Sequence, residues 1–150
     1  MSATQDTFKV YMDIDLLAGK VEKKLEPVDS DITGIVGIAG DRVGYIIIAT
    51  DKASAQCVAK GLLMVDEADD DCIRDAVGEL ANNIAGAFKT KYHTHYGNVA
   101  LGLPLVVSGQ LRAITETPNT STSINVQCKG VTIPFNTADG TISIMVMIYI

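Results

Sequence analysis

The chain has 150 residues, a length typical of a single domain that can bury a hydrophobic core without metal or disulfide support. Twelve Lys and Arg residues against eighteen Asp and Glu residues give a net charge of −6, with a pI near 4.7, which disfavours binding to nucleic acid and to anionic membrane surfaces. Apolar residues make up 47% of the chain and charged residues 20%, so we expect one packed domain over residues 1–150 rather than a disordered chain.

Targeting and redox signals are weak throughout the sequence. The N-terminal residues carry no basic stretch followed by an apolar run, and no run of about eighteen apolar residues could form a spanning helix. We therefore expect a cytoplasmic protein without membrane insertion. The cysteines Cys57, Cys72 and Cys128 lack ligand-like spacing, so neither zinc nor a disulfide is predicted, and all three are expected to be small buried residues.

The first predicted elements are strands. Apolar and polar residues alternate over 8–16, which favours a strand there. Residues 19–31 are polar and fit either a second strand or one helical turn. Two runs rich in β-branched residues, 32–39 and 43–50, flank Gly40-Asp41-Arg42, a pattern that predicts a β-hairpin.

Two helices follow the hairpin. Apolar residues recur at spacings of three and four over 51–64, the period of a helix. A longer helix is predicted from the acidic cluster 66–71 to about Lys91, with acids at its positive end and lysines at its negative end. The acidic cluster lacks the spacing of a calcium loop. His93 and His95 have no third ligand nearby, so a loop after the helix is favoured over a metal site.

Strand patterns return after the second helix, over 103–107, 111–115, 123–128, 131–135 and 141–150. The expected fold class is therefore α+β, with a mainly antiparallel sheet and two central helices packed on it. The last strand is apolar on both faces. Such a strand is either central in a sheet covered by helices or paired across a subunit boundary, and this motivates the prediction of a homodimer.

The long helix has two contrasting faces. Ile73, Val77, Leu80, Ile84 and Phe88 form a core-facing stripe. About 100° per residue places another stripe nearly opposite, made of Asp75, Glu79, Asn82 and Gly86. An ordinary solvated face would explain that stripe, but such faces normally contain strong helix formers. Here the helix contains Gly78, Ala81, Asn82, Asn83, Ala85 and Gly86, which predicts a thin surface that another backbone can approach closely.

The segment Asp75-Ala-Val-Gly-Glu79-Leu-Ala-Asn82-Asn-Ile-Ala-Gly86 closely resembles the signature helix of the CheC/CheX/FliY phosphatases of bacterial chemotaxis, above all the CheX branch. The hairpin from Gly34, the strand containing Pro104 and the segment 131–135 resemble the same family, so the resemblance spans about residues 33–150. A single signature helix favours a CheX-like chain over the two-helix CheC type. CheX-like proteins usually begin with an amphipathic helix, whereas residues 1–30 here favour a strand.

The resemblance implies a CheC-like fold and a phosphatase that hydrolyses the aspartyl phosphate of a CheY-like response regulator. By the family's logic Asn82 orients the attacking water, and Glu79 pairs with a lysine of the regulator. The resemblance also implies that this chain binds no cofactor, because Mg²⁺ is expected in the partner's receiver domain. Asp75, Gly78, Asn83 and Gly86 are expected to contact the partner; Asp75 also fits a helix-solubilising acid, and Asn83 fits either a rim contact or a second water-positioning amide.

Two other functions are compatible with the sequence. A non-catalytic adaptor could dock a receiver domain or a flagellar-motor component on the same helix, although an adaptor has no chemical reason to keep Glu79 and Asn82 together. An unrelated α+β dimer would require the resemblance to be accidental.

Overall fold

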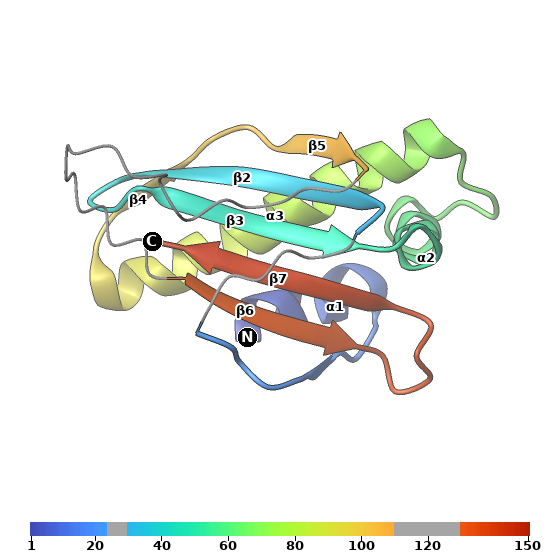
Figure 1. The fold of residues 1–150 in the computed structure, drawn as a ribbon, viewed down its shortest axis with the longest axis horizontal. Helices are drawn as coiled ribbons and strands as arrows, with labels where there is room; N and C mark the ends of the chain where they lie inside the picture. Colours follow the sequence, from blue (N-terminus) through green and yellow to red (C-terminus); the bar gives the residue numbers. More distant parts are fainter. Residues whose placement is uncertain (24–29, 110–129) are drawn as a thin grey trace, which may run out of the picture.

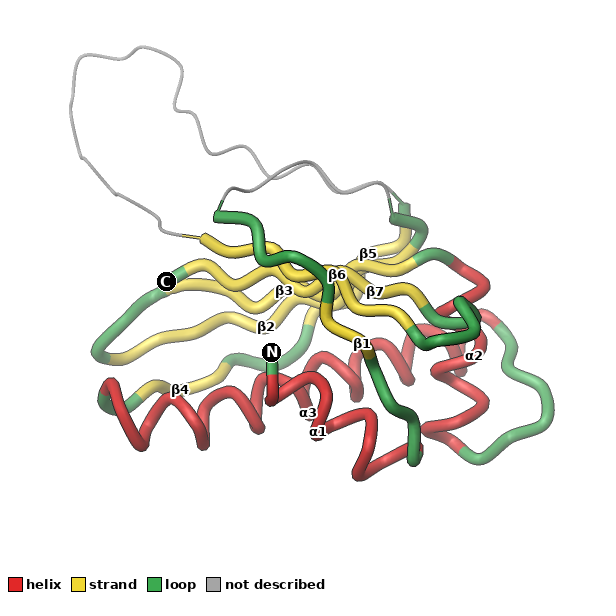
Figure 2. Tube along the Cα trace, turned by 90° about the horizontal axis from the view of Figure 1, so that it is seen from below, coloured by secondary structure: helices red, strands yellow, loops and turns green. Residues whose placement is uncertain are grey.

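The computed structural model describes residues 1–23, 30–109 and 130–150. These residues form a seven-stranded sheet and three helices. All three helices lie against one face of the sheet, as the edge-on view shows (Figure 2). The predicted α+β class with a mainly antiparallel sheet is confirmed, because every strand pair in the described residues is antiparallel.

The centre of the sheet is built from the predicted hairpin and the two C-terminal strands (Figure 1). The hairpin comprises β2 (Ile32–Gly40) and β3 (Gly44–Thr50), in a register that pairs Ile38 with Gly44. The strand β7 (Ser143–Tyr149) lies between β3 and β6 (Gly130–Asn136), and the short β1 (Leu17–Ala18) pairs with the outer side of β6. Both edges of β7 are therefore paired within this chain. The central-strand interpretation of 141–150 is confirmed, and the motive it gave for a homodimer falls away.

The other side of β2 is occupied by two short strands in succession. Here β4 (Val99–Leu101) pairs with 38–40 and β5 (Leu105–Ser108) pairs with 32–35. Pro104 lies in the break between them, where its missing N–H costs no ladder hydrogen bond. The predicted strand at 103–107 is confirmed with shifted bounds, and β4 was not predicted. The strands predicted at 111–115 and 123–128, and Cys128, lie outside the described residues.

Both predicted helices are present. The helix α2 (Lys52–Leu63) is capped by Asp51, whose side chain accepts a hydrogen bond from the Ser54 N–H. The helix α3 (Asp70–Tyr96) is capped by Asp69, which accepts from the Cys72 N–H at 2.8 Å. That hydrogen bond holds the pKa of Asp69 below its usual value. The acidic cluster therefore starts a helix, as predicted.

The C-terminal end of α3 lies further along the chain than expected. Aromatic rings contact one another there in a tilted geometry, with the centroids of Phe88 and Tyr92 5.3 Å apart and those of Tyr92 and Tyr96 5.1 Å apart. The helix ends at Gly97, whose φ of 108° is accessible mainly to glycine. The prediction that His93 and His95 lie in a loop is therefore wrong, because both stand exposed in the last turn of the helix.

The N-terminal segment is a helix, so the predicted strand at 8–16 is wrong. The helix α1 (Ser2–Met12) buries one face, made of Ala3, Thr4, Thr7 and Phe8, which recur at the helical spacing of four. Of the residues whose alternation suggested a strand, Val10 is 76% exposed. The amphipathic N-terminal helix that the family resemblance implied is thus present, and packing of Phe8 outweighed the local alternation.

The main core lies between the helices and the sheet. Its most deeply buried side chains come from all three helices and from four strands, and include Phe8, Val58, Leu80, Ile84, Val36, Ile46, Ile48, Phe135 and Val146. A separate cluster on the opposite face of the sheet contains Ile47, Ala49, Met147 and Tyr149. The prediction of buried cysteines is wrong for Cys57, which is exposed, and holds only in part for Cys72, which is half-buried on α3 and packs against a smaller cluster between α2 and α3. In the described part of the chain, no helix combines the length and apolarity needed to cross a membrane.

Candidate functional site

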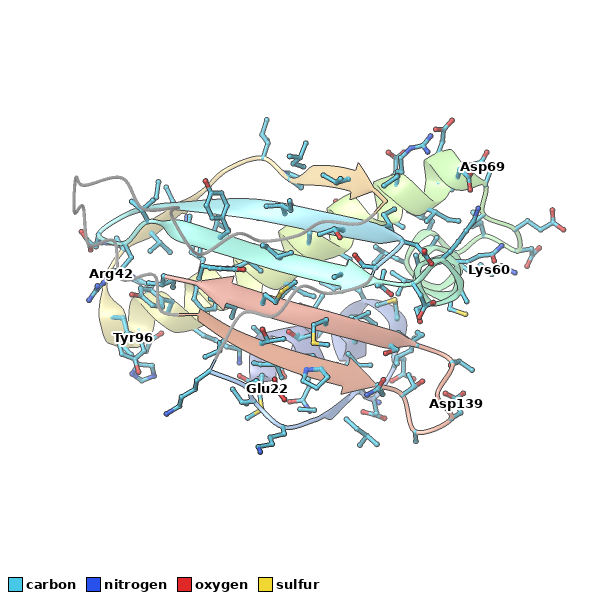
Figure 3. The ribbon with its side chains drawn as sticks, in the orientation of Figure 1. Glu22, Arg42, Lys60, Asp69, Tyr96 and Asp139 are labelled. Atoms are coloured by element: carbon cyan, nitrogen blue, oxygen red, sulfur yellow. The ribbon has the colours of Figure 1, made fainter. Side chains whose placement is uncertain are left out.

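The helix α3 runs along the length of the molecule, from Asp69 at one end to Tyr96 at the other (Figure 3). The predicted core stripe is confirmed: Ile73, Val77, Leu80 and Ile84 are buried, and Phe88 packs against the core. On the opposite side, Asp75, Glu79 and Asn82 are exposed and Gly86 is half-buried. The two faces of the helix therefore lie where their spacing predicted.

Glu79 and Asn82 are neighbours on this exposed face, because residues three apart on a helix have Cβ atoms about 5–6 Å apart. Neither side chain forms a hydrogen bond or ion pair with any residue that the structure describes. One is an anionic acceptor, and the other is a neutral amide that both donates and accepts. Together they offer a carboxylate for a cation and an amide for water or a phosphoryl oxygen.

The small residues of α3 serve mainly the packing of the helix on the sheet. Ala81 and Ala85 are fully buried. A Cβ built on Gly34 of β2 would lie 2.9 Å from the Ala81 Cβ and 3.1 Å from the Val77 carbonyl oxygen, so the two elements touch almost backbone to backbone. Gly78 is also buried. A Cβ built on it would lie 3.3 Å from the Cγ2 atom of Val106 in β5. Gly78 was expected to contact a partner; the structure corrects this, because β5 already covers it.

A cleft of about 360 Å³ separates the exposed face of α3 from α1, and we call it the α1–α3 cleft. It is lined by Asp6, Thr7, Val10, Tyr11, Asn82, Asn83, Gly86 and Ala87. The α1 wall of the cleft was not predicted from the sequence, because the alternation over 8–16 is typical of a strand. The helical spacing of Thr4 and Phe8 was the signal that could have revealed it.

The structure thus brings Asn82, Asn83 and Gly86 to one cleft and places Glu79 and Asp75 beside them on the open face of the helix. The Nδ2 atom of Asn83 is buried and has no hydrogen-bond acceptor among the described residues. Lys91 of α3 reaches across to α1 and pairs with Asp6 at 2.7 Å. A surface ion pair thus links α1 to α3 beside the cleft, and the exposed Asn82 amide is free to contact a partner.

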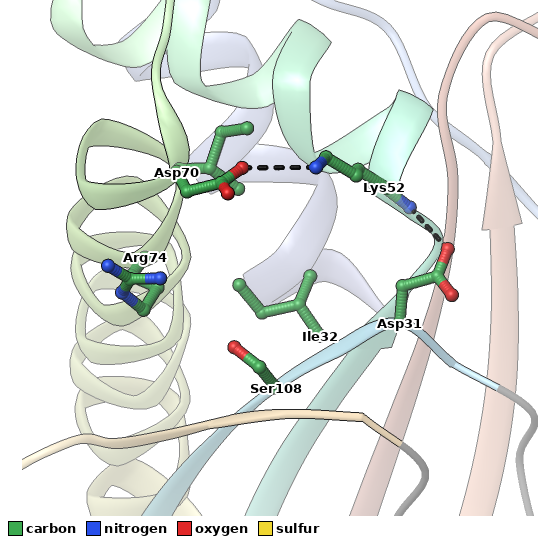
Figure 4. Close-up of a pocket in the computed structure, with 7 residues that line it drawn as sticks. Asp31, Ile32, Lys52, Asp70, Arg74 and Ser108 are labelled. Atoms are coloured by element: carbon green, nitrogen blue, oxygen red, sulfur yellow. Dashed lines mark hydrogen bonds and ion pairs between the residues drawn. The ribbon is translucent and has the colours of Figure 1, made fainter.

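A second pocket, of about 220 Å³, lies where α2 and α3 begin (Figure 4). Lys52 donates its backbone N–H to Asp31 at 2.8 Å, and its ammonium contacts Asp70 at 3.1 Å. Arg74 in the same pocket pairs with Asp71. Each cation of the pocket therefore already has a carboxylate, and the pocket ties helix starts together rather than presenting free charge to an anion.

Metal-ligating side chains do not form a comparable site in the described ranges. No three His, Cys, Asp or Glu residues gather there closely enough to hold an ion. The best-supported functional surface is therefore the exposed face of α3 with the adjoining α1–α3 cleft.

Comparisons with known proteins point to one family. Residues 32–136, more than two thirds of the chain, match the family model described as chemotaxis phosphatase CheX. A chemotaxis protein CheX from Desulfovibrio desulfuricans superposes with a TM-score of 0.80 at 25% identity, covering 98% of this chain and 93% of that chain. A CheX–CheY–BeF3–Mg²⁺ complex from Borrelia burgdorferi gives a TM-score of 0.74 at 25% identity, over 99% and 92%.

A CheX from Vibrio vulnificus shares the fold at 20% identity, with a TM-score of 0.77 over 99% of this chain and 93% of that chain. No curated protein sequence matches the chain at a significant level.

Proposed function

The chain belongs to the CheX family of chemotaxis phosphatases, and from that premise we propose that it hydrolyses the aspartyl phosphate of a CheY-like response regulator. A CheX of similar fold stands in a complex with CheY from Borrelia burgdorferi, which supports a CheY-like receiver domain as the partner. In the proposed reaction a water oxygen attacks phosphorus and the bond to the aspartate oxygen breaks. The products are inorganic phosphate and the free carboxylate of the regulator.

One observation carries this proposal: Glu79 and Asn82 stand together, exposed and unpaired among the described residues, on a helix whose other face is buried. Phosphoryl transfer needs little covalent chemistry from a protein, since positioning and charge stabilisation supply most of the acceleration. A rigid helix anchored through its buried face is a suitable support for both tasks.

Asn82 is proposed to hold the attacking water in line with the scissile bond. Its amide can accept a hydrogen bond from the water and donate one to a phosphoryl oxygen. The amide also stays neutral beside a dianion, so it adds no repulsion. Its position at the edge of the α1–α3 cleft leaves room for the receiver's site to approach.

Glu79 is proposed to pair with a lysine of the receiver domain and so to set the docking orientation. An unpaired carboxylate next to a phosphoryl group would be unfavourable, and a lysine between them removes the repulsion. Asp75, one turn before Glu79, is exposed and adds negative charge to the same face. Asp75 and Gly86 are thus proposed as contacts at the margin of the interface.

The proposal assigns no metal or cofactor to this chain; Mg²⁺ is expected in the receiver domain of the partner. Carboxylates and a phosphoryl oxygen are the ligands that Mg²⁺ prefers, and a receiver phosphorylated on aspartate supplies both kinds. The work left to this chain is to bind, to orient water and to exclude unproductive geometries.

A homodimer is also proposed, although its support is no longer the last strand. Among the described strands β5 pairs only with β2. Leu103 and Leu105 lie beside the edge of β5 that no described strand pairs with, and they are 93% and 59% exposed. Open edges with apolar side chains favour association with a second chain.

The experiment that tests the phosphatase proposal times the loss of phosphate from a panel of phosphorylated receiver domains, each with and without this protein. At least one receiver should lose its phosphate faster in the presence of catalytic amounts of the protein. Binding to a phosphorylated receiver without any acceleration would instead support the adaptor function, and neither binding nor acceleration across the panel would contradict both.

A further inference from the structure

The α1–α3 cleft continues directly from the residue to which the chemistry is assigned. Asn82 lines it at one side, while Val10 and Tyr11 of α1 form the opposite lip. We propose that this cleft is a docking subsite for the receiver domain, which inserts the chain segment beside its phosphorylated aspartate, and that Asn83 donates a hydrogen bond to a backbone carbonyl of that segment. This inference rests on the proposed function and adds a second contact surface to it.

The position of the cleft next to Asn82 indicates which partner occupies it. If Asn82 reaches a phosphoryl group, the receiver's backbone next to that group must lie within a few ångströms of Asn82, and the cleft is the hollow that adjoins it. The cleft, of about 360 Å³, is open to the surface rather than enclosed, so a segment of a docked protein can enter it from outside.

The side-chain amide of Asn83 supplies a hydrogen-bond donor that lacks an acceptor among the described residues. Its Nδ2 is buried without an acceptor in the described part of the chain, and buried polar groups in folded proteins are normally paired. The terminal torsion of asparagine is broad and soft, so the amide can turn toward an acceptor that enters the cleft. A backbone carbonyl is the acceptor that every loop carries.

The charges in the cleft favour a neutral segment over a free anion. Asp6 is the acidic residue of the lining, and Lys91 pairs with it at 2.7 Å. On the α1 lip, Val10 is 76% exposed and Tyr11 is 50% exposed. These side chains can contact apolar side chains and peptide backbone of the receiver. The charged contact of the interface is made by Glu79, which lies outside the cleft.

A substitution at Gly86 can block the subsite without disturbing the core. This glycine lines the cleft, and a Cβ built on it would meet no atom within 4 Å. A side chain added there extends into open space rather than into the core. Replacing glycine within a helix also removes an entropic penalty, so substitution at this position should not destabilise the fold.

The experiment measures steady-state kinetics on a phosphorylated receiver domain that the wild-type protein dephosphorylates, together with thermal unfolding of every variant. Gly86→Leu should raise KM at least tenfold while kcat changes less than twofold. Tyr11→Ala and Asn83→Ala should each raise KM about three- to tenfold, the loss expected for one contact at an interface. Asn83→Ala should leave the melting temperature equal or higher, because it removes an unsatisfied donor. Gln56→Leu, an exposed change on α2 away from the cleft, is the matched control and should match wild type.

Wild-type KM values for Gly86→Leu and Tyr11→Ala, in folded proteins that still accelerate dephosphorylation, would overturn the subsite while leaving the proposed function intact. A loss of kcat with unchanged KM would also contradict it, because the cleft would then serve the chemistry rather than docking. A change in sedimentation of Gly86→Leu without a change in KM would assign the cleft to contacts between copies of this chain. Failure of the wild-type protein on every receiver would instead refute the proposed function, and this inference with it.

Discussion

The close contact between β2 and α3 makes the position of the candidate site depend on one glycine. A Cβ at Gly34 would lie 2.9 Å from the Ala81 Cβ and 3.3 Å from Val77 Cγ1, whereas carbon atoms in contact normally lie about 3.5–4.0 Å apart. Gly34→Ala therefore pushes α3 outward by about 0.6–1.1 Å or strains the strand. Overpacking of this kind costs about 1–3 kcal/mol, which for a domain of this size lowers the melting temperature by roughly 2–12 °C.

The same displacement moves Glu79 and Asn82 with the helix. A misplacement of about 1 Å can reduce a reaction that depends on positioning by up to ~100-fold, so Gly34→Ala should lose phosphatase activity even at temperatures where it is folded. Gly37→Ala is the matched control, because it lies on the same strand and its Cβ would meet nothing within 4 Å. Thermal unfolding and initial rates of both variants are the measurements. Equal melting temperatures for the two variants would refute the packing argument.

Three further predictions concern charge and association. The Thr137 hydroxyl and the Thr141 N–H lower the pKa of Asp139 from 3.8 to about 2, so its stabilising contribution is present above pH ~4 and is lost as the pH falls through about 2. Denaturant unfolding between pH 5 and 2 should show the gap between wild type and Asp139→Asn closing on acidification, and a constant gap would contradict this. Glu79→Lys should weaken binding to the phosphorylated receiver more than Glu79→Gln does, as measured by titration. Equal affinities of the two variants for the receiver would contradict an ion pair between Glu79 and a receiver lysine. The protein should sediment as a dimer and Leu105→Lys as a 15.9 kDa monomer, whereas a monomeric wild type would end the dimer proposal.

Periodicity predicted the parts of the fold whose burial pattern is regular. The sequence predicted the hairpin over 32–50 correctly, because its β-branched residues form two short runs around a turn. It also predicted the buried helix face of Ile73, Val77 and Leu80, because apolar residues recur there at helical spacing toward one core. The start of α3 was also predictable, since an Asp at the cap and acids in the first turn act locally. The exposure of Glu79 and Asn82 was also predictable, because helical geometry places them opposite the buried stripe.

The errors arose where contacts distant in sequence decide the structure. Residues 8–12 alternate like a strand, but Phe8 is buried against the helices and Val10 is exposed, which local alternation cannot reveal. The small residues Gly78 and Ala81 suggested a surface for a partner, yet they pack against this chain's own strands β5 and β2. Glycine and alanine permit close approach of any backbone, and only the fold identifies which one.

The most direct test of the account compares wild type with Asn82→Ala at saturating protein, following the phosphate on a receiver domain in a single turnover while binding is measured in parallel. Asn82 is exposed and lies opposite the core stripe, so the variant should fold and melt like wild type. If Asn82 orients the attacking water, the rate should fall by about 100-fold or more while affinity for the phosphorylated receiver changes little. A wild-type rate for the folded variant would contradict the assignment of the chemistry to this helix.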